Sequence, residues 1–242
     1  MSRRLPLALL VFALGHVAAS AAEVATRGVV FVANGEGGTV TMIDSGTYQV
    51  LRSIDVIPDG DRPSLERDPV QAMAFPAVVF AGGDNFAQDL DISPDGRTLY
   101  VSRGHLGDVA AFDVASGAML WRAEVGSFRA DHMTISADGA RLFVSAITEN
   151  HVEVLDAASG APLGAFAAGE WPHDNVLSAD GKRVYNGGIG NVLLPEEARN
   201  DRPEALDAVV SPPYQLTIAD AATLEIVGTH RFERGICSEP TH

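Results

Sequence analysis

The sequence predicts an all-β protein, and three observations support this prediction. A segment with the pattern Ile/Leu-Ser-x-Asp-Gly occurs three times, beginning at Ile92, Ile135 and Leu177, with spacings of 43 and 42 residues. Each copy leads into a run in which apolar residues alternate with other residues, as in Leu99 to Ser102, which is typical of a strand. The 24 glycines and 13 prolines are numerous enough for a protein rich in turns. A period of about 40–45 residues with four short strands is typical of a β-propeller blade.

The strands expected from this pattern form about four blades of four antiparallel strands. The first blade shows only three strands in the sequence. Expected strands cover residues 29–33, 39–44 and 50–56; 90–93, 98–103, 108–114 and 119–125; 132–136, 141–146, 151–156 and 162–168; and 175–178, 183–186, 215–220 and 225–232.

Three Asp-Gly pairs should form the turns that join the first and second strands of the later blades. These pairs are Asp95-Gly96, Asp138-Gly139 and Asp180-Gly181. Glycine adopts a positive φ at no steric cost, so it suits a tight turn between two strands. Because the pairs recur with the blades, we interpret all six residues as structural.

The repeated segments resemble the YVTN β-propeller repeat of YncE-like exported bacterial proteins. The resemblance rests on the Ile-Ser-x-Asp-Gly element and on Val152-Glu-Val-Leu-Asp156, and it extends from residue 28 to about 232. It implies a ring of seven blades, of which about four are present. The chain is therefore expected to be a truncated ring, and the alternatives are a four-bladed ring or a half-ring that forms a homodimer.

The first 22 residues are predicted to be a signal peptide. Arg3 and Arg4 precede an apolar segment, residues 5–14, and Ala19-Ser20-Ala21 offers a cleavage site. We expect the propeller in residues 23–234 and a tail without repeats in residues 235–242. No later apolar segment is long enough to span a membrane, so a periplasmic or secreted location is expected.

Composition excludes several classes of function. With 17 Lys and Arg against 32 Asp and Glu, the net charge of −15 argues against nucleic acid as a partner. The single cysteine, Cys237, excludes the Cys-x-x-Cys-His motif for covalent haem. Gly187-Gly188-Ile189-Gly190 does not match the dinucleotide fingerprint, so no NAD site is expected.

The candidate site lies where the first strand of each blade begins. Aligning the repeats places Gln88-Asp89, Asp131-His132 and His173-Asp174 at equivalent positions near the central channel, and Asn175, the next residue, is a further candidate. His105 is expected in a loop on the same face. Imidazole and carboxylate groups together suit a divalent metal or acid–base chemistry. The alternative is structural, since such side chains can also bond the backbone of the neighbouring blade.

Two hypotheses for function follow. The first is a binding scaffold without catalysis, which presents its top face to a small ligand or a partner protein. The top-face loops include the long segments 57–88 and 188–213. The second is a metal-assisted hydrolase or an oxidoreductase that uses the Asp and His residues at the channel. A third interpretation, a non-functional remnant, follows from the missing blades.

Overall fold

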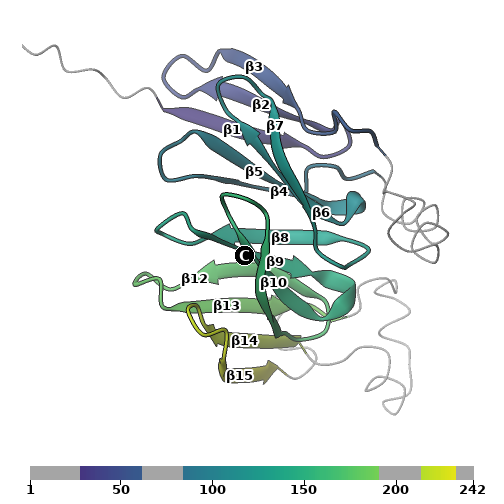
Figure 1. Ribbon diagram of the computed structural model, residues 1–242, viewed down its shortest axis with the longest axis vertical. Helices are drawn as coiled ribbons and strands as arrows, with labels where there is room; N and C mark the ends of the chain where they lie inside the picture. The colour runs from purple at the N-terminus through teal and green to yellow at the C-terminus, as the bar shows by residue number, and fades with distance from the viewer. Residues whose placement is uncertain (1–27, 62–83, 191–213, 233–242) are drawn as a thin grey trace, which may run out of the picture.

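The structure is a computed structural model, and it describes residues 28–61, 84–190 and 214–232. The predicted signal peptide, the predicted tail with Cys237, and much of the two long segments lie outside the described residues. The described chain forms four antiparallel sheets that follow one another like the blades of a fan (Figure 1). The predicted all-β propeller architecture with about four blades is therefore confirmed.

Fifteen strands make up the four sheets, one of three strands and three of four. The first sheet holds β1 (Val29–Asn34), β2 (Thr39–Asp44) and β3 (Val50–Asp55); the second β4 (Asp89–Ile92), β5 (Thr98–Arg103), β6 (Asp108–Asp113) and β7 (Met119–Glu124); the third β8 (Ala130–Ile135), β9 (Arg141–Ala146), β10 (His151–Asp156) and β11 (Pro162–Ala167); the fourth β12 (Pro172–Leu177), β13 (Arg183–Gly188), β14 (Tyr214–Asp220) and β15 (Ile226–Phe232). Within each sheet, every strand pairs with the next along the chain, as in a meander.

The Asp-Gly turns of the second, third and fourth blades close in the same way. In the first of them, the Ser93 hydroxyl and the Arg97 N–H both donate to Asp95 Oδ1, and Gly96 has a φ of 71°. Asp138 and Asp180 accept the equivalent serine hydroxyl and backbone N–H, and Gly139 and Gly181 also have positive φ. The hydroxyl in each turn lowers the pKa of its aspartate, so these carboxylates bond within their own turns.

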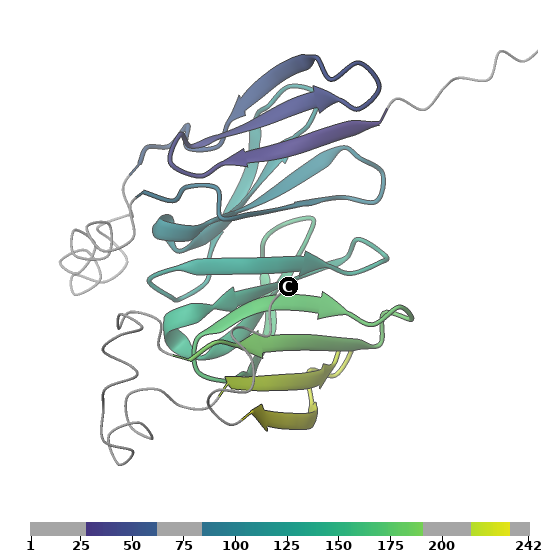
Figure 2. The same ribbon diagram turned by 180° about the vertical axis from the view of Figure 1, so that it is seen from behind.

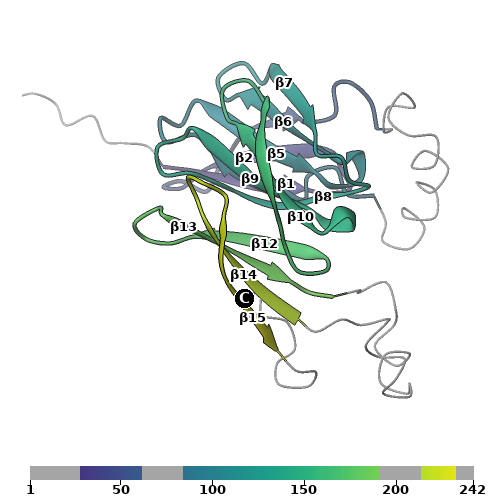
Figure 3. The ribbon, with the colours of Figure 1, turned by 60° about the horizontal axis from the view of Figure 1, so that its bottom comes forward.

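The hydrophobic core is divided into layers between successive blades. The order of the blades can be followed in the ribbon from three directions (Figures 1, 2 and 3). Val40 and Ile54 of the first sheet pack with Phe112 of the second. Tyr100 packs with Leu142 between the second and third sheets, and Phe143 packs with Val184 between the third and fourth. Burial of this apolar surface holds each blade to its neighbour.

The innermost strands β4, β8 and β12 lie next to one another, and they give the fold two different ends. At one end, called the turn end here, are the Asp-Gly turns, which lie on the left in Figure 1. At the other, called the mouth end, β4, β8 and β12 begin, and the short 3₁₀ helices η1 (Gly104–Leu106) and η2 (Ile147–Glu149) connect strands. Among the described residues no helix has the length and hydropathy needed to cross a membrane.

Candidate functional site

Two β-bulges place the candidate residues at the mouth end. In β8, Asp131 and His132 together oppose one residue of β9, because the pairing moves from Ala130 directly to Met133. In β12, His173 is the extra residue of a similar shift. The sequence placed His173 and Asp174 before the strand, and this boundary was wrong: β12 begins at Pro172. A bulge lets a strand start early and redirects a side chain.

The bulges bring three side chains together from two neighbouring blades. Asp131, His132 and His173 each offer an oxygen or nitrogen atom, and these atoms all lie within 4.8 Å of one another. Asp131 Oδ1 is 3.7 Å from His132 Nε2 and 4.0 Å from His173 Nε2. The two imidazole rings have centroids 4.5 Å apart. The structure thus groups three of the seven residues proposed from the sequence.

Asp89 and Asn175 make bonds from one blade to the next. Asp89 Oδ2 accepts the N–H of Met133 at 2.9 Å and lies 3.4 Å from His132 Nδ1. The Asn175 amide donates to the carbonyl of His132 and to the hydroxyl of Ser145. The sequence also allowed a structural role, in which these side chains bond the neighbouring blade. Asn175 has this role. Asp89 bonds the backbone of the neighbouring blade and also faces a histidine.

Asp174 and His105 lie outside the group of three. Asp174 Oδ1 accepts the N–H of Asn175, the next residue. His105, on η1, is almost fully buried, and its Nδ1 accepts the N–H of Asn85 at 3.1 Å. The His105 ring therefore holds the chain that leads into β4, since that nitrogen is used in a backbone bond.

Gln88 and Arg129 also contact the group of three residues. Arg129 was not among the residues predicted from the sequence. The Gln88 Nε2 donates to Asp131 Oδ1 at 2.9 Å, and Arg129 Nη2 donates to Gln88 Oε1 at 2.7 Å. Arg129 Nε lies 3.6 Å from Asp131 Oδ2. Arg129 directly precedes β8, and Asp131 lies in the bulge, so the alternation of a regular strand gave no signal that would have placed the two side chains together.

The two histidines have pKa values shifted in opposite directions. The interaction with Asp89 raises the pKa of His132, and the charge of Asp131 adds to this effect although burial opposes it. Burial lowers the pKa of His173, and proximity to His132 lowers it further although Asp131 opposes this. Relative to a free imidazole, the surroundings therefore favour the charged form of His132 and disfavour the charged form of His173.

A third carboxyl, Asp91, lies on the same side of β4 as Asp89. Burial raises the pKa of Asp91 to about 7, and the negative charge of Asp89 adds to the shift, while the N–H of Ile135 opposes it. The carboxyl is therefore about half protonated at neutral pH, whereas an ordinary aspartate is almost fully ionised there.

A buried arginine supports the mouth end of the second blade. Arg103 is fully buried, and its guanidinium donates to both oxygens of Asp108 and both of Asp59. Burial of Asp59 opposes its ionisation, but hydrogen bonds from Arg103 and Arg122 outweigh this effect and lower the pKa of Asp59 to about 2. The network fixes the segment after β3 against the second blade.

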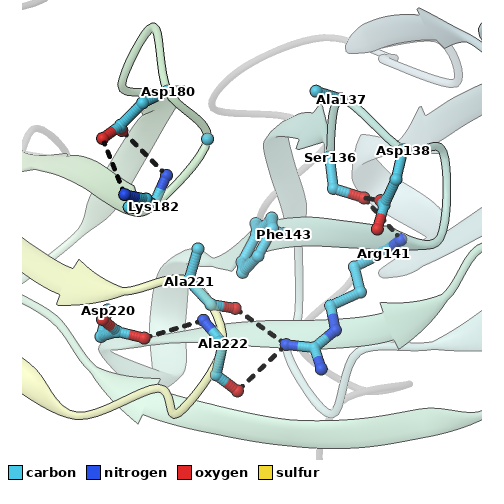
Figure 4. A pocket seen from close by; sticks show the side chains of 11 residues that line it. Ser136, Ala137, Asp138, Arg141, Phe143, Asp180, Lys182, Asp220, Ala221 and Ala222 are labelled. Carbon is cyan, nitrogen blue, oxygen red and sulfur yellow. Dashed lines mark hydrogen bonds and ion pairs between the residues drawn. The ribbon is translucent and has the colours of Figure 1, made fainter.

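The turn end also has a groove, but its polar groups are used within the fold (Figure 4). The groove has a volume of about 550 Å³ and lies between the third and fourth blades. Arg141 spans it and donates to the carbonyls of Ala221 and Ala222 at 2.8 and 3.1 Å. Asp138, Asp180 and Asp220 accept backbone N–H groups of their own turns. These polar groups of the groove therefore stabilise the turns and the contact between the two blades, and we do not assign a ligand to the groove.

The sequence matches a known family. Residues 13–163 and 105–200 match the family described as outer membrane protein assembly factor BamB. The chain belongs to this family. No curated protein matches the chain.

Solved structures show the same fold as this BamB-family chain. Hydrazine synthase of Kuenenia stuttgartiensis superimposes with a TM-score of 0.60 at 18% identity, over 84% of this chain and 46% of that chain. A mitotic checkpoint complex superimposes with a TM-score of 0.56 at 16% identity, over 84% of this chain and 47% of that chain. The present chain thus spans less than half of the length of either relative.

Proposed function

We propose that the protein is an exported binding scaffold that holds a protein partner or a small ligand at the mouth end of its propeller. One observation carries the proposal: in this BamB-family chain, the polar side chains at the two ends of the propeller are arranged differently. At the turn end, the same Ser-x-Asp-Gly turn recurs in three blades and uses its polar groups internally. At the mouth end, the polar side chains differ from blade to blade, and recognition needs such differences.

Family membership favours a protein partner over a small ligand. The matching family is named for an outer membrane protein assembly factor, and a role in assembly favours contact with other proteins. The predicted signal peptide in residues 1–22 and the YVTN-like repeats support export to the same compartment. The hydrolase or oxidoreductase alternative has no support from the comparisons, because structural similarity at 16–18% identity shows the fold alone.

The proposal can be tested by photo-crosslinking in cells that export the protein. A photoreactive residue replaces Glu170, which is exposed three positions before His173, or Lys182, which is exposed at the turn end. We expect a discrete adduct in the periplasmic fraction from position 170 and none from position 182, and excess protein without the photoreactive group should reduce it. Adduct formation only from position 182, or from neither position, would contradict the proposal.

A further inference from the structure

We propose that Asp131, His132 and His173 bind one divalent transition metal ion, of the class of Zn²⁺ or Co²⁺, at the mouth of the propeller channel. This inference goes beyond the scaffold function and does not depend on the identity of a binding partner. It starts from the three side chains that two bulges bring together.

The separation of the donor atoms suits a small cation. Zinc bonds to nitrogen and carboxylate oxygen at about 2.0–2.2 Å, so two ligands of a tetrahedral site lie about 3.3–3.6 Å apart. Asp131 Oδ1 lies 3.7 Å from His132 Nε2 and 4.0 Å from His173 Nε2. Shifts of less than about 1 Å, within the range of side-chain rotation, would bring these atoms to the tetrahedral spacing.

Neighbouring groups orient two of the three ligands. The Asp89 carboxylate faces His132 Nδ1 at 3.4 Å, which leaves His132 Nε2 to face Asp131 and His173. Asp89 is itself held by the N–H of Met133. A carboxylate behind a histidine in this way is the common outer partner of a metal-binding imidazole.

The two oxygens of Asp131 have separate partners. Oδ2 faces Arg129 at 3.6 Å, and Oδ1 faces the histidines and accepts a hydrogen bond from Gln88 Nε2. The Gln88 amide nitrogen also lies 3.4 Å from His132 Nε2. A metal ion would displace that amide from the histidine while Arg129 retains the second oxygen.

His173 provides an independent observation that indicates a ligand. Its Nδ1 is buried and has no hydrogen-bond partner among the described residues. A buried polar atom without a partner costs free energy and is rare in native proteins. An ion bound by the His173 imidazole would give this side chain a partner that the described residues do not supply.

The donor set selects the class of metal. Two imidazoles with one carboxylate favour zinc, cobalt or another late first-row ion over calcium and magnesium, which prefer oxygen ligands. Three protein ligands leave at least one coordination position for water or for an exchangeable ligand. The carboxylates of Asp89 and Asp174 near the site add negative charge that favours a cation.

The test is metal titration of the untagged protein after removal of bound ions with a chelator. Calorimetry with Zn²⁺ and visible absorption with Co²⁺ should show one ion per chain. His173→Asn should weaken binding by about 100-fold or more, given that even outer partners of a metal site contribute 10–100-fold. The matched control is His151→Asn, because His151 pairs with Glu153 outside the cluster and has similar exposure.

Circular dichroism confirms that each variant is folded, and His132→Gln replaces His173→Asn if that variant does not fold. One ion per chain, lost in the cluster variant and retained in His151→Asn, supports the site. Absence of stoichiometric binding to the unmodified protein overturns the proposal. Equal affinity in the cluster variant and the control also overturns it.

Discussion

The rings of His132 and His173 belong to neighbouring blades, and their centroids are 4.5 Å apart with the ring planes tilted by 59°. Each histidine lies at an irregularity in the pairing between the first two strands of its blade. In the second blade, β4 pairs with β5 in an unbroken register from Asp89 to Ile92. The two histidines thus lie at bulges that occur in the third and fourth blades but not in the second. A strictly regular repeat would not have these bulges.

Replacing Asp89 tests whether the carboxylate positions His132. Asp89→Asn removes the negative charge that faces His132 Nδ1 but retains an oxygen that can accept the N–H of Met133. We expect Zn²⁺ affinity to fall by about 10–100-fold, the usual effect of losing an outer carboxylate. Calorimetry measures the affinity, and Glu153→Gln is the control, since it changes a carboxylate that pairs with His151 instead. Equal affinities in the two variants would argue against a positioning role.

The buried Arg103 should be important for stability. Arg103→Met fills much of the same volume, but it leaves the buried Asp108 with Arg122 in place of two guanidinium partners. Breaking a buried ion pair leaves charge without full compensation, and we expect a loss of about 3 kcal/mol in the free energy of unfolding. Urea denaturation measures this loss. Arg97→Met, at an exposed arginine of the turn end, should change stability by less than about 0.5 kcal/mol.

Asp91 should make stability depend on pH between about 4 and 7. The unfolded chain ionises this group near the ordinary value of 3.8, whereas the folded pKa is about 7. As the pH rises through this window, the unfolded state loses its proton first, so the contribution of Asp91 to stability falls. Asp91→Asn should therefore be more stable than the unmodified protein at pH 8, by up to about 4 kcal/mol.

At pH 4 the unmodified protein and the Asp91→Asn variant should differ little in stability. In the folded state Asp91 is then protonated, so its side chain is uncharged, like that of asparagine. Thermal and urea unfolding at both pH values measure the difference. A stabilisation of equal size at pH 4 and pH 8 would show that Asp91 does not have the raised pKa.

Two turn glycines form a matched pair that isolates contact between blades. Gly181 has a φ of 69° and open space where a Cβ would lie, whereas a Cβ on Gly139 would meet Pro94 Cδ of the preceding blade at 2.7 Å. Gly181→Ala should cost about 1 kcal/mol from backbone strain alone. Gly139→Ala should cost about 1–3 kcal/mol more, because the neighbouring turn must also move. Equal losses in urea denaturation would show that this contact tolerates the methyl group.

The repeated turns made most of the fold predictable. Asp95-Gly96 and its counterparts fix where two strands meet, and alternation on either side fixes which residues point inward, so most strand bounds were correct within one or two residues. The starts of β8 and β12 were less predictable. A bulge depends on the space between blades, and the residues near His132 and His173 carry no local turn signal that specifies it.

The candidate site was predictable only in part for a related reason. The alignment of repeats placed Asp131, His132 and His173 at one radius, and the structure groups them. The alignment could not show that His105 lies outside this group. The ring of His105 bonds the backbone of Asn85, and that contact joins segments far apart in the sequence. The role of Arg129 depends equally on the conformation of a long side chain.

The metal site proposed at the mouth end consists of Asp131, His132 and His173. The most direct test is X-ray diffraction at the zinc absorption edge from crystals of the untagged protein grown with one equivalent of Zn²⁺. We predict one strong anomalous peak about 2.0–2.2 Å from a carboxylate oxygen of Asp131 and from one nitrogen of each histidine. Zinc found only elsewhere, for example at His151 and Glu153, or no peak at all, would contradict the proposed metal site.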